Sequence, residues 1–205
     1  MSKNIFLYFA LVITFIFIAG FIYTQYLKPE LDSRTVVVTT QMPVVSTVAP
    51  LQFKFPSGPD ALALIEPPTG DVTETGIKEV YLLMDNKQYL EFSKEEGVPP
   101  ATISVFVLPY VDSAETDGLK RAEKLRAWAV ANPQFSSWGA ATTEPQSVEV
   151  DGVRAIAYKT ESVYKQNVYV TLYNDDVYVF TGQYEKEGDT MQQMFTEILA
   201  EVILT

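Results

Sequence analysis

The chain has 205 residues, a formal net charge of −11, and neither cysteine nor histidine. Without cysteine it has no disulfide, thiolate zinc site or cysteine nucleophile, and without histidine it has no Ser-His-Asp triad and lacks the commonest metal ligand. The acidic balance argues against DNA or RNA as a partner, because binding a phosphate backbone needs clustered Lys and Arg.

The first predicted element is a membrane-spanning helix near the N-terminus. No charged residue occurs between Asn4 and Leu27, and the centre of this stretch, Ile5–Tyr23, is rich in Ile, Phe, Leu and Val. About 19 helical residues span about 28 Å, close to the hydrocarbon core of a bilayer. A cleaved signal peptide is the alternative, but its apolar run is shorter and is followed by a small-x-small site. We therefore predict an uncleaved anchor that contacts the lipid bilayer through Ile5–Tyr23.

The chain is expected to divide into three parts. Residues 1–28 form the anchor with a short cytoplasmic head, residues 29–50 an extended linker, and residues 51–205 one α+β domain outside the cytoplasm. The flanking charges alone leave the orientation ambiguous. The layout, a short head, one span and a long C-terminal domain, is that of exported signal-anchored proteins, which predicts a single-pass protein of the plasma membrane. A disulfide-free exported domain fits a bacterial or archaeal source.

The linker is β-branched and contains Pro43 and Pro50. Such a segment prefers extended conformations, so we interpret it as a spacer that lifts the domain off the membrane. The alternative is an edge strand laid on the domain, since proline is tolerated on edges.

The first half of the domain is expected to contain short strands. Thr102–Tyr110 is apolar on both faces, which indicates a central strand. Two earlier strands are expected to form a hairpin through Asp85-Asn86-Lys87. These two hairpin strands are Glu79–Met84 and Gln88–Phe92. Two further strands are expected before them, at Gln52–Phe55 and Ala61–Ile65.

Two amphipathic helices follow from apolar residues at helical spacing. The first covers Asp117–Asn132 and is stopped by Pro133. The second runs from Asp189 to near the C-terminus, with Asp189 as N-cap and Gln192 placed as in a capping box.

A β meander is expected between the helices. Asp151-Gly152 is a strong two-residue hairpin signal, and Asn174-Asp175-Asp176 marks a second turn. The order strands, helix, strands, helix predicts an antiparallel sheet with helices packed on it. The flanking strands are Val148–Val150, Val153–Lys159, Asn167–Tyr173 and Val177–Tyr184.

Several of these segments together resemble a known family. They are Phe53-Lys54-Phe55-Pro56-Ser57-Gly58, the helix that carries Trp128, Val150-Asp151-Gly152-Val153-Arg154-Ala155, Val177-Tyr178-Val179-Phe180-Thr181-Gly182 and Phe195-Thr196-Glu197-Ile198-Leu199. The pattern looks like that of PsbP-like domains over Leu51–Thr205. The resemblance implies an αβα sandwich and a non-enzymatic binding or accessory role.

No cofactor or metal site is expected. The chain has no glycine-rich phosphate loop, nucleotide fingerprint or zinc-protease helix. The segment Asp71–Gly76 opens like an EF-hand loop but has too few ligands and Leu82 at its twelfth position. We interpret Asn174-Asp175-Asp176 as a hairpin turn in preference to a surface cation site, because these residue types are the ones that such a turn needs. Paired carboxylates remain the only catalytic apparatus, so the chain is not expected to be an enzyme.

The candidate recognition residues are tyrosines on the late strands, Tyr169, Tyr173 and Tyr178. Tyr169 and Tyr173 are four apart and so share a sheet face. Tyrosine is enriched at recognition surfaces because it offers a large rigid area with a polar tip. The alternative is ordinary cross-strand aromatic packing under a helix.

These features favour a membrane-anchored binding or accessory module that engages an envelope protein outside the cytoplasm. Two alternatives stay open: an envelope hydrolase that uses paired carboxylates, and a self-associating structural protein of the cell surface. An acid pair with raised pKa in a concave pocket would favour the hydrolase.

Overall fold

The computed structural model describes residues 44–48, 51–56, 61–65, 76–92, 98–110 and 120–205. The expected anchor at Ile5–Tyr23 lies outside these residues and stays a prediction. All but the last residue of Asp71–Gly76, the segment that opens like an EF-hand loop, also lies outside them. In the part of the chain that is described, no helix is long and apolar enough to cross a membrane.

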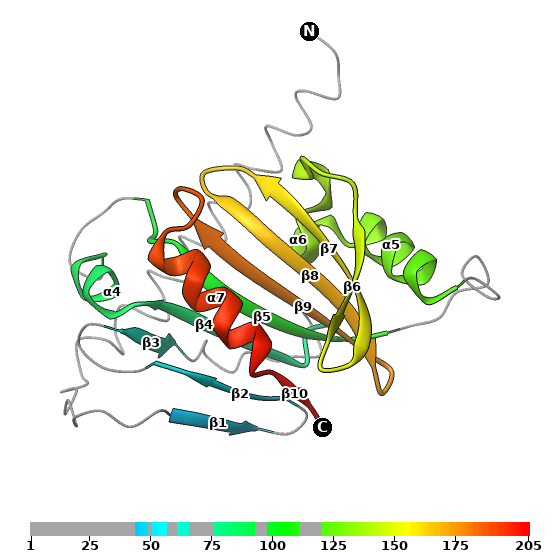
Figure 1. Ribbon diagram of the computed structural model, residues 1–205, viewed down its shortest axis with the longest axis horizontal. Coiled ribbons are helices and arrows are strands. Elements are labelled where there is room, and N and C mark those ends of the chain that lie inside the picture. The colour runs from blue at the N-terminus through cyan, green and yellow to red at the C-terminus, as the bar shows by residue number, and fades with distance from the viewer. Residues whose placement is uncertain (1–43, 49–50, 57–60, 66–75, 93–97, 111–119) are drawn as a thin grey trace, which may run out of the picture. The chain divides into compact units, whose positions relative to one another are not determined.

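The largest element is a seven-stranded sheet in which every neighbouring pair is antiparallel, in the order β3-β4-β5-β9-β8-β7-β6 (Figure 1). Its strands are β3 Leu62–Ile65, β4 Glu79–Asp85, β5 Thr102–Pro109, β6 Gln146–Val150, β7 Val153–Glu161, β8 Lys165–Tyr173 and β9 Asp176–Tyr184. The β5–β9 pairing joins the early strands to the late meander. The predicted antiparallel α+β architecture is confirmed, and β5 lies in the interior of the sheet between β4 and β9, as its two-sided apolar pattern indicated.

A second, three-stranded sheet has the order β1-β2-β10, with β1 Val44–Val48, β2 Leu51–Phe55 and β10 Ile203–Leu204. β1 pairs antiparallel with β2 over its whole length. Val44–Val48 was expected to be part of an extended spacer, and the structure shows the alternative, an edge strand. A β-branched segment favours the extended conformation that pairs with the backbone groups of β2. The short strand β10 at the C-terminus was not predicted.

The sheet separates two hydrophobic cores, and β9 contributes to both. Tyr178 and Phe180 face the first core and Val177 and Val179 the second, as alternation along a strand requires. The helix α7, Thr190–Ala200, and the small sheet cover the first core. The second lies under α5, Arg121–Ala131, with α6, Pro133–Ser136, and the short 3-10 helix η2, Trp138–Ala140, beside it (Figure 1).

The expected hairpin at Asp85 is wrong in its second half. The chain turns directly into the helix α4, Asn86–Phe92, where a strand over Gln88–Phe92 was expected. Asp85 Oδ1 accepts a hydrogen bond from Gln88 N at 2.9 Å. Asp85 therefore acts as a helix N-cap. Aspartate and asparagine are favoured at helix N-caps as well as in turns, so the pair Asp85-Asn86 fits either structure.

Two of the three turns of the late meander, β6–β7 and β8–β9, are two-residue turns with left-handed backbones. Asp151 and Gly152 have φ of 50° and 68°, and Asn174 and Asp175 have φ of 48° and 62°. Two successive positive φ values are the signature of type I′ hairpins. The first turn is as predicted, and the second is one residue shorter because Asp176 already belongs to β9.

The helices begin with local caps. In α5, Glu123 Oε2 accepts a hydrogen bond from Lys120 N at 3.0 Å, and Lys120 is the N-cap. The helix was expected to begin at Asp117, but residues 111–119 lie outside the described ranges. Pro133 ends α5 as predicted but also begins α6. In α7, the predicted N-cap Asp189 accepts from Gln192 N at 2.9 Å. The Gln192 side chain accepts from Gly188 N, one residue before a standard capping box.

The helix α7 docks on β9 through one close contact. The Phe195 ring lies over Gly182, where an added Cβ would come within 2.2 Å of Phe195 Cγ. Phe195 also packs against Tyr169 of β8, with ring centroids 5.8 Å apart. Glycine is therefore required at position 182 by the approach of the ring.

Replacing Gly182 with alanine tests this contact. The Cβ must displace a buried ring, so Gly182→Ala should lower the free energy of unfolding by about 1–3 kcal/mol. Gly139→Ala is the matched control, because a Cβ there meets nothing within 4 Å. Urea unfolding of both variants measures the difference, and equal stabilities would contradict the docking described.

Candidate functional site

A hollow of about 180 Å³ lies on the sheet face that carries α7, near the β6 edge. The register places Gln146, Ala157 and Tyr169 in one row across β6, β7 and β8. Ala157 has the smallest side chain of the three, so the row is lowest in its middle. The hollow is lined by Thr143, Gln146, Ala157, Tyr158, Lys159, Asn167 and Tyr169.

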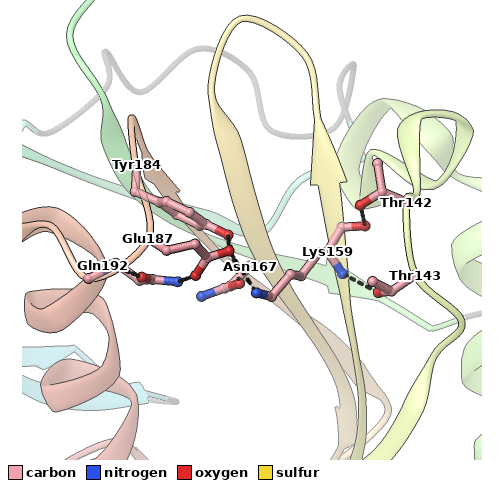
Figure 2. Close-up of polar contacts among 8 residues, drawn as sticks. Thr142, Thr143, Lys159, Asn167, Tyr184, Glu187 and Gln192 are labelled. Carbon is pink, nitrogen blue, oxygen red and sulfur yellow. Dashed lines mark hydrogen bonds and ion pairs between the residues drawn. The ribbon is translucent and has the colours of Figure 1, made fainter.

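A network of polar side chains borders the hollow on the side of α7 (Figure 2). Lys159 Nζ donates to Glu187 Oε1 at 2.8 Å, and Tyr184 OH donates to the same oxygen at 3.1 Å. Gln192 Nε2 donates to Glu187 Oε2 at 2.9 Å. The Tyr184 hydroxyl also lies 3.5 Å from Asn167 Oδ1. One carboxylate thus joins β7, β9 and α7, and the positive charge of Lys159 is balanced.

Two groups in this network have shifted pKa values. The hydrogen bonds from Lys159 and Gln192, with a smaller contribution from Tyr184, lower the pKa of Glu187 to about 2. Burial, followed by the hydrogen bond to Glu187, raises the pKa of Tyr184 to about 12. Glu187 is therefore a fixed anion at neutral pH and does not act as a general acid.

The far wall of the hollow is held by backbone hydrogen bonds. Lys159 N donates to Thr143 Oγ1 at 2.9 Å, and Thr142 N donates to Lys159 O at 2.8 Å. A bridge between Ala141 and Thr160 continues this pairing. The segment before β6 therefore runs beside β7 and keeps its side chains in place, as Figure 2 shows for Thr142 and Thr143.

The hollow offers uncharged hydrogen-bonding groups around a partly apolar floor. Gln146 and Asn167 each carry an amide that donates and accepts, and Tyr169 adds a hydroxyl and a ring. Within the described ranges, no group of three or more Asp, Glu, His or Cys side chains is placed to hold a metal ion. The arrangement suits recognition of a polar molecule.

Of the three candidate tyrosines, the structure brings only Tyr169 to the hollow. Tyr173 is half-buried against the first core, and Tyr178 is 0% exposed within it. Tyr178 therefore follows the aromatic-packing alternative, because β9 is covered on both faces. Gln146, Asn167 and Lys159, which line the hollow with Tyr169, were not predicted. The alternating small residues Ala155 and Ala157 were the available sequence signal for a depression in the sheet surface.

The Tyr178 hydroxyl is buried and, among the described residues, has no hydrogen-bond partner. Burial, and then the nearby charges of Asp176 and Glu79, raise the pKa of Tyr178 to about 12. Both carboxylates are already engaged: Asp176 pairs with Lys78 at 2.5 Å, and Glu79 accepts from the Tyr81 hydroxyl. The β8–β9 turn thus ends in an ion pair between Asp176, at the start of β9, and Lys78, just before β4.

Removing the unpaired hydroxyl should stabilise the protein. Tyr178→Phe is expected to raise the free energy of unfolding by about 1 kcal/mol, because it removes a buried group that has lost its water. Tyr158→Phe is the matched control: its hydroxyl donates to Ser136 O at 2.7 Å, so its loss should cost about 1 kcal/mol. Chemical denaturation gives both signs, and a destabilised Tyr178→Phe would show a partner for that hydroxyl.

The Glu187 network should stabilise the protein in a pH-dependent way. Its pKa is depressed in the folded state, so its contribution is full above the ordinary value near 4.5 and is lost as the pH falls towards 2. The stability gap between the native protein and Glu187→Gln should therefore shrink across that window. Thermal melts from neutral to acid pH measure it.

Lys159→Met supplies the control for this experiment. In a protein that already carries Lys159→Met, the further change Glu187→Gln should lower the stability less at neutral pH than it does in the native protein. The reason is that two residues in one network do not act additively. A gap that is constant with pH, or unchanged by Lys159→Met, would contradict the network.

Comparison with known proteins gives the fold and no family assignment. No protein-family model matches the chain, and no curated protein sequence does. The solution structure of cyanobacterial PsbP (CyanoP) from Synechocystis sp. PCC 6803 is similar, with a TM-score of 0.50 and 13% sequence identity over 84% of this chain and 98% of that one. The chain therefore has a PsbP-like fold.

A second similar structure is a crystal structure of a protein from Bacteroides thetaiotaomicron VPI-5482. It has a TM-score of 0.46 and 12% sequence identity over 82% of this chain. The match covers 49% of that protein, so this chain spans about half of its length.

Proposed function

We propose that this chain is a binding or accessory module, anchored in the plasma membrane by Ile5–Tyr23, whose domain engages an envelope component outside the cytoplasm. The anchor and the topology rest on the hydropathy and layout of the sequence. The proposed contact surface is the hollow between β6, β7 and β8, with Tyr169 at its floor.

The observation that carries the proposal is the composition of the hollow. It combines an aromatic ring with two amides and a hydroxyl, on three strands that pair with one another in one sheet. Sites that recognise a ligand typically combine apolar and aromatic surface with a few fixed polar groups. Groups held on a rigid sheet lose little conformational entropy on binding, which favours affinity.

The hydrolase alternative has less support at this site. It needs two converging carboxylic acids, one of which keeps its proton near neutral pH through a raised pKa. Glu187 is the carboxylate that contacts Lys159 of the lining, and its pKa is lowered to about 2. It is held by three donors as an anion and serves to position Lys159.

A single-cysteine experiment tests both the location and the surface. The natural chain has no cysteine, so Gln146→Cys carries the only thiol. Val163→Cys is the matched control, because Val163 is 74% exposed but lies at the β7–β8 turn, away from the hollow lining. A membrane-impermeant maleimide with a photoreactive arm is added to intact cells that make the full chain.

We expect both variants to be labelled in intact cells and only Gln146→Cys to capture a stoichiometric partner. Labelling that requires cell lysis would contradict the location outside the cytoplasm. Capture that is equal at both positions would contradict the hollow as the contact surface. Capture of nothing except further copies of this chain would favour the self-associating alternative.

A further inference from the structure

We propose that the hollow binds one neutral sugar unit of an envelope glycan. This inference rests on the proposed function and names the chemistry of its ligand. Four properties of the site carry it: its charge, its hydrogen-bonding groups, its apolar floor and its size.

The charge of the site favours an uncharged ligand. Lys159 is the cation in the lining, and its ammonium is 2.8 Å from Glu187 Oε1. Gln192 and Tyr184 also donate hydrogen bonds to that carboxylate. An anionic ligand gains little from Lys159, because Glu187 already balances its charge, and a cationic ligand gains little from Glu187 for the same reason. A neutral ligand leaves the network intact.

The hydrogen-bonding groups suit hydroxyls. Amides such as those of Gln146 and Asn167 both donate and accept, and so do the hydroxyls of Thr143 and Tyr169. A sugar hydroxyl also donates and accepts, so each of these side chains has a complementary partner in either orientation. A ligand with acceptors alone, such as a phosphate, would leave half of these groups unmatched.

The floor suits the apolar face of a pyranose ring. Ala157 and Tyr169 are direct neighbours in the register, so a methyl group lies beside an aromatic ring. The C–H face of a sugar gains dispersion and buries apolar surface on such a floor. The Tyr169 ring is held by Phe195 at a centroid distance of 5.8 Å, which keeps the floor from collapsing.

The size limits what enters. Pockets for drug-sized ligands measure roughly 300–1,000 Å³, whereas this hollow measures about 180 Å³. One ring therefore fits, and the rest of a chain of sugars runs out along the sheet. The backbone groups of Thr142 and Lys159 beside the hollow already bond to each other, so a peptide strand does not pair with them there. Adding a strand gains affinity from unpaired backbone groups.

Saturation-transfer NMR on the full chain tests the inference, in a zwitterionic detergent without a sugar headgroup. The probes are cellotetraose and chitotetraose as neutral oligosaccharides, with tetragalacturonate as the charged comparison. We expect transfer to a neutral probe at millimolar concentration, concentrated on the C–H protons of one ring. Tetragalacturonate should show none.

Variants assign the signal to the hollow. Gln146→Ala should weaken binding up to about tenfold through lost hydrogen bonds, and Asn167→Ala similarly. Tyr169→Phe keeps the ring and should retain most of the transfer, whereas Tyr169→Leu should lose it. Val163→Ala, at an exposed residue that is not part of the lining, should bind as the native protein does. Circular dichroism shows that each variant is folded.

Several results would overturn the inference. One is no transfer to either neutral probe, and another is transfer that Gln146→Ala and Asn167→Ala leave unchanged. A Gln146→Cys capture that consists of peptide alone contradicts the sugar while the binding module stands. Mass spectrometry of a sugar-containing capture distinguishes its source: a glycopeptide indicates a glycan on a partner protein, and a saccharide alone indicates an envelope polysaccharide. Either source supports the inference.

Discussion

The contact of the Phe195 ring with the backbone of Gly182 determines how the α7 side of the domain is built. It brings α7 against β9 and sets the ring beside Tyr169. The β9–α7 turn ends at the N-cap Asp189 of the same helix. Glu187 lies in that turn, and its carboxylate holds Lys159 of β7. The helix α7 thus packs Phe195 against the floor of the hollow, and the turn that precedes it supplies Glu187 at the wall.

The sheet explains why the hollow lies where it does. Its middle strands are covered on both faces, by α7 and the small sheet on one side and by α5 with its neighbours on the other. Aromatic side chains in that region, such as Tyr178 and Phe180, pack in the core. At β6 the cover ends, and its residues are largely exposed. Groups on β7 and β8 near this edge are therefore both rigid and accessible, which suits recognition.

The sequence predicted most of the fold because its local signals agree with its tertiary structure. The turn at Asp151-Gly152, the cap at Asp189 and the apolar run of β5 each favour one low-energy conformation. Prediction failed where one signal serves two structures: Asp85 caps a helix as readily as it opens a turn, and Val44–Val48 extends with or without a partner. Pairing with a distant strand, as in β10, leaves no local pattern at all.

The site was harder to predict than the fold. Tyr169 was found because tyrosine is conspicuous, and Tyr178 was chosen for the same reason although its strand is buried on both faces. Gln146, Asn167 and Lys159 come together only through the register of three strands and the turn before α7. No spacing in the sequence encodes that meeting, and the carboxylate of Glu187 that governs their charge lies 28 residues away from Lys159.

The central claim is that the hollow is preformed, with α7 and β9 as one stable unit. Hydrogen–deuterium exchange of the full chain, read peptide by peptide, tests it most directly. The account predicts that amides of α7 and of β7–β9 open together and exchange slowly, because one packed core protects them. Fast exchange in α7 beside slow exchange in β9 would contradict it, since the wall of the hollow would then form only after binding.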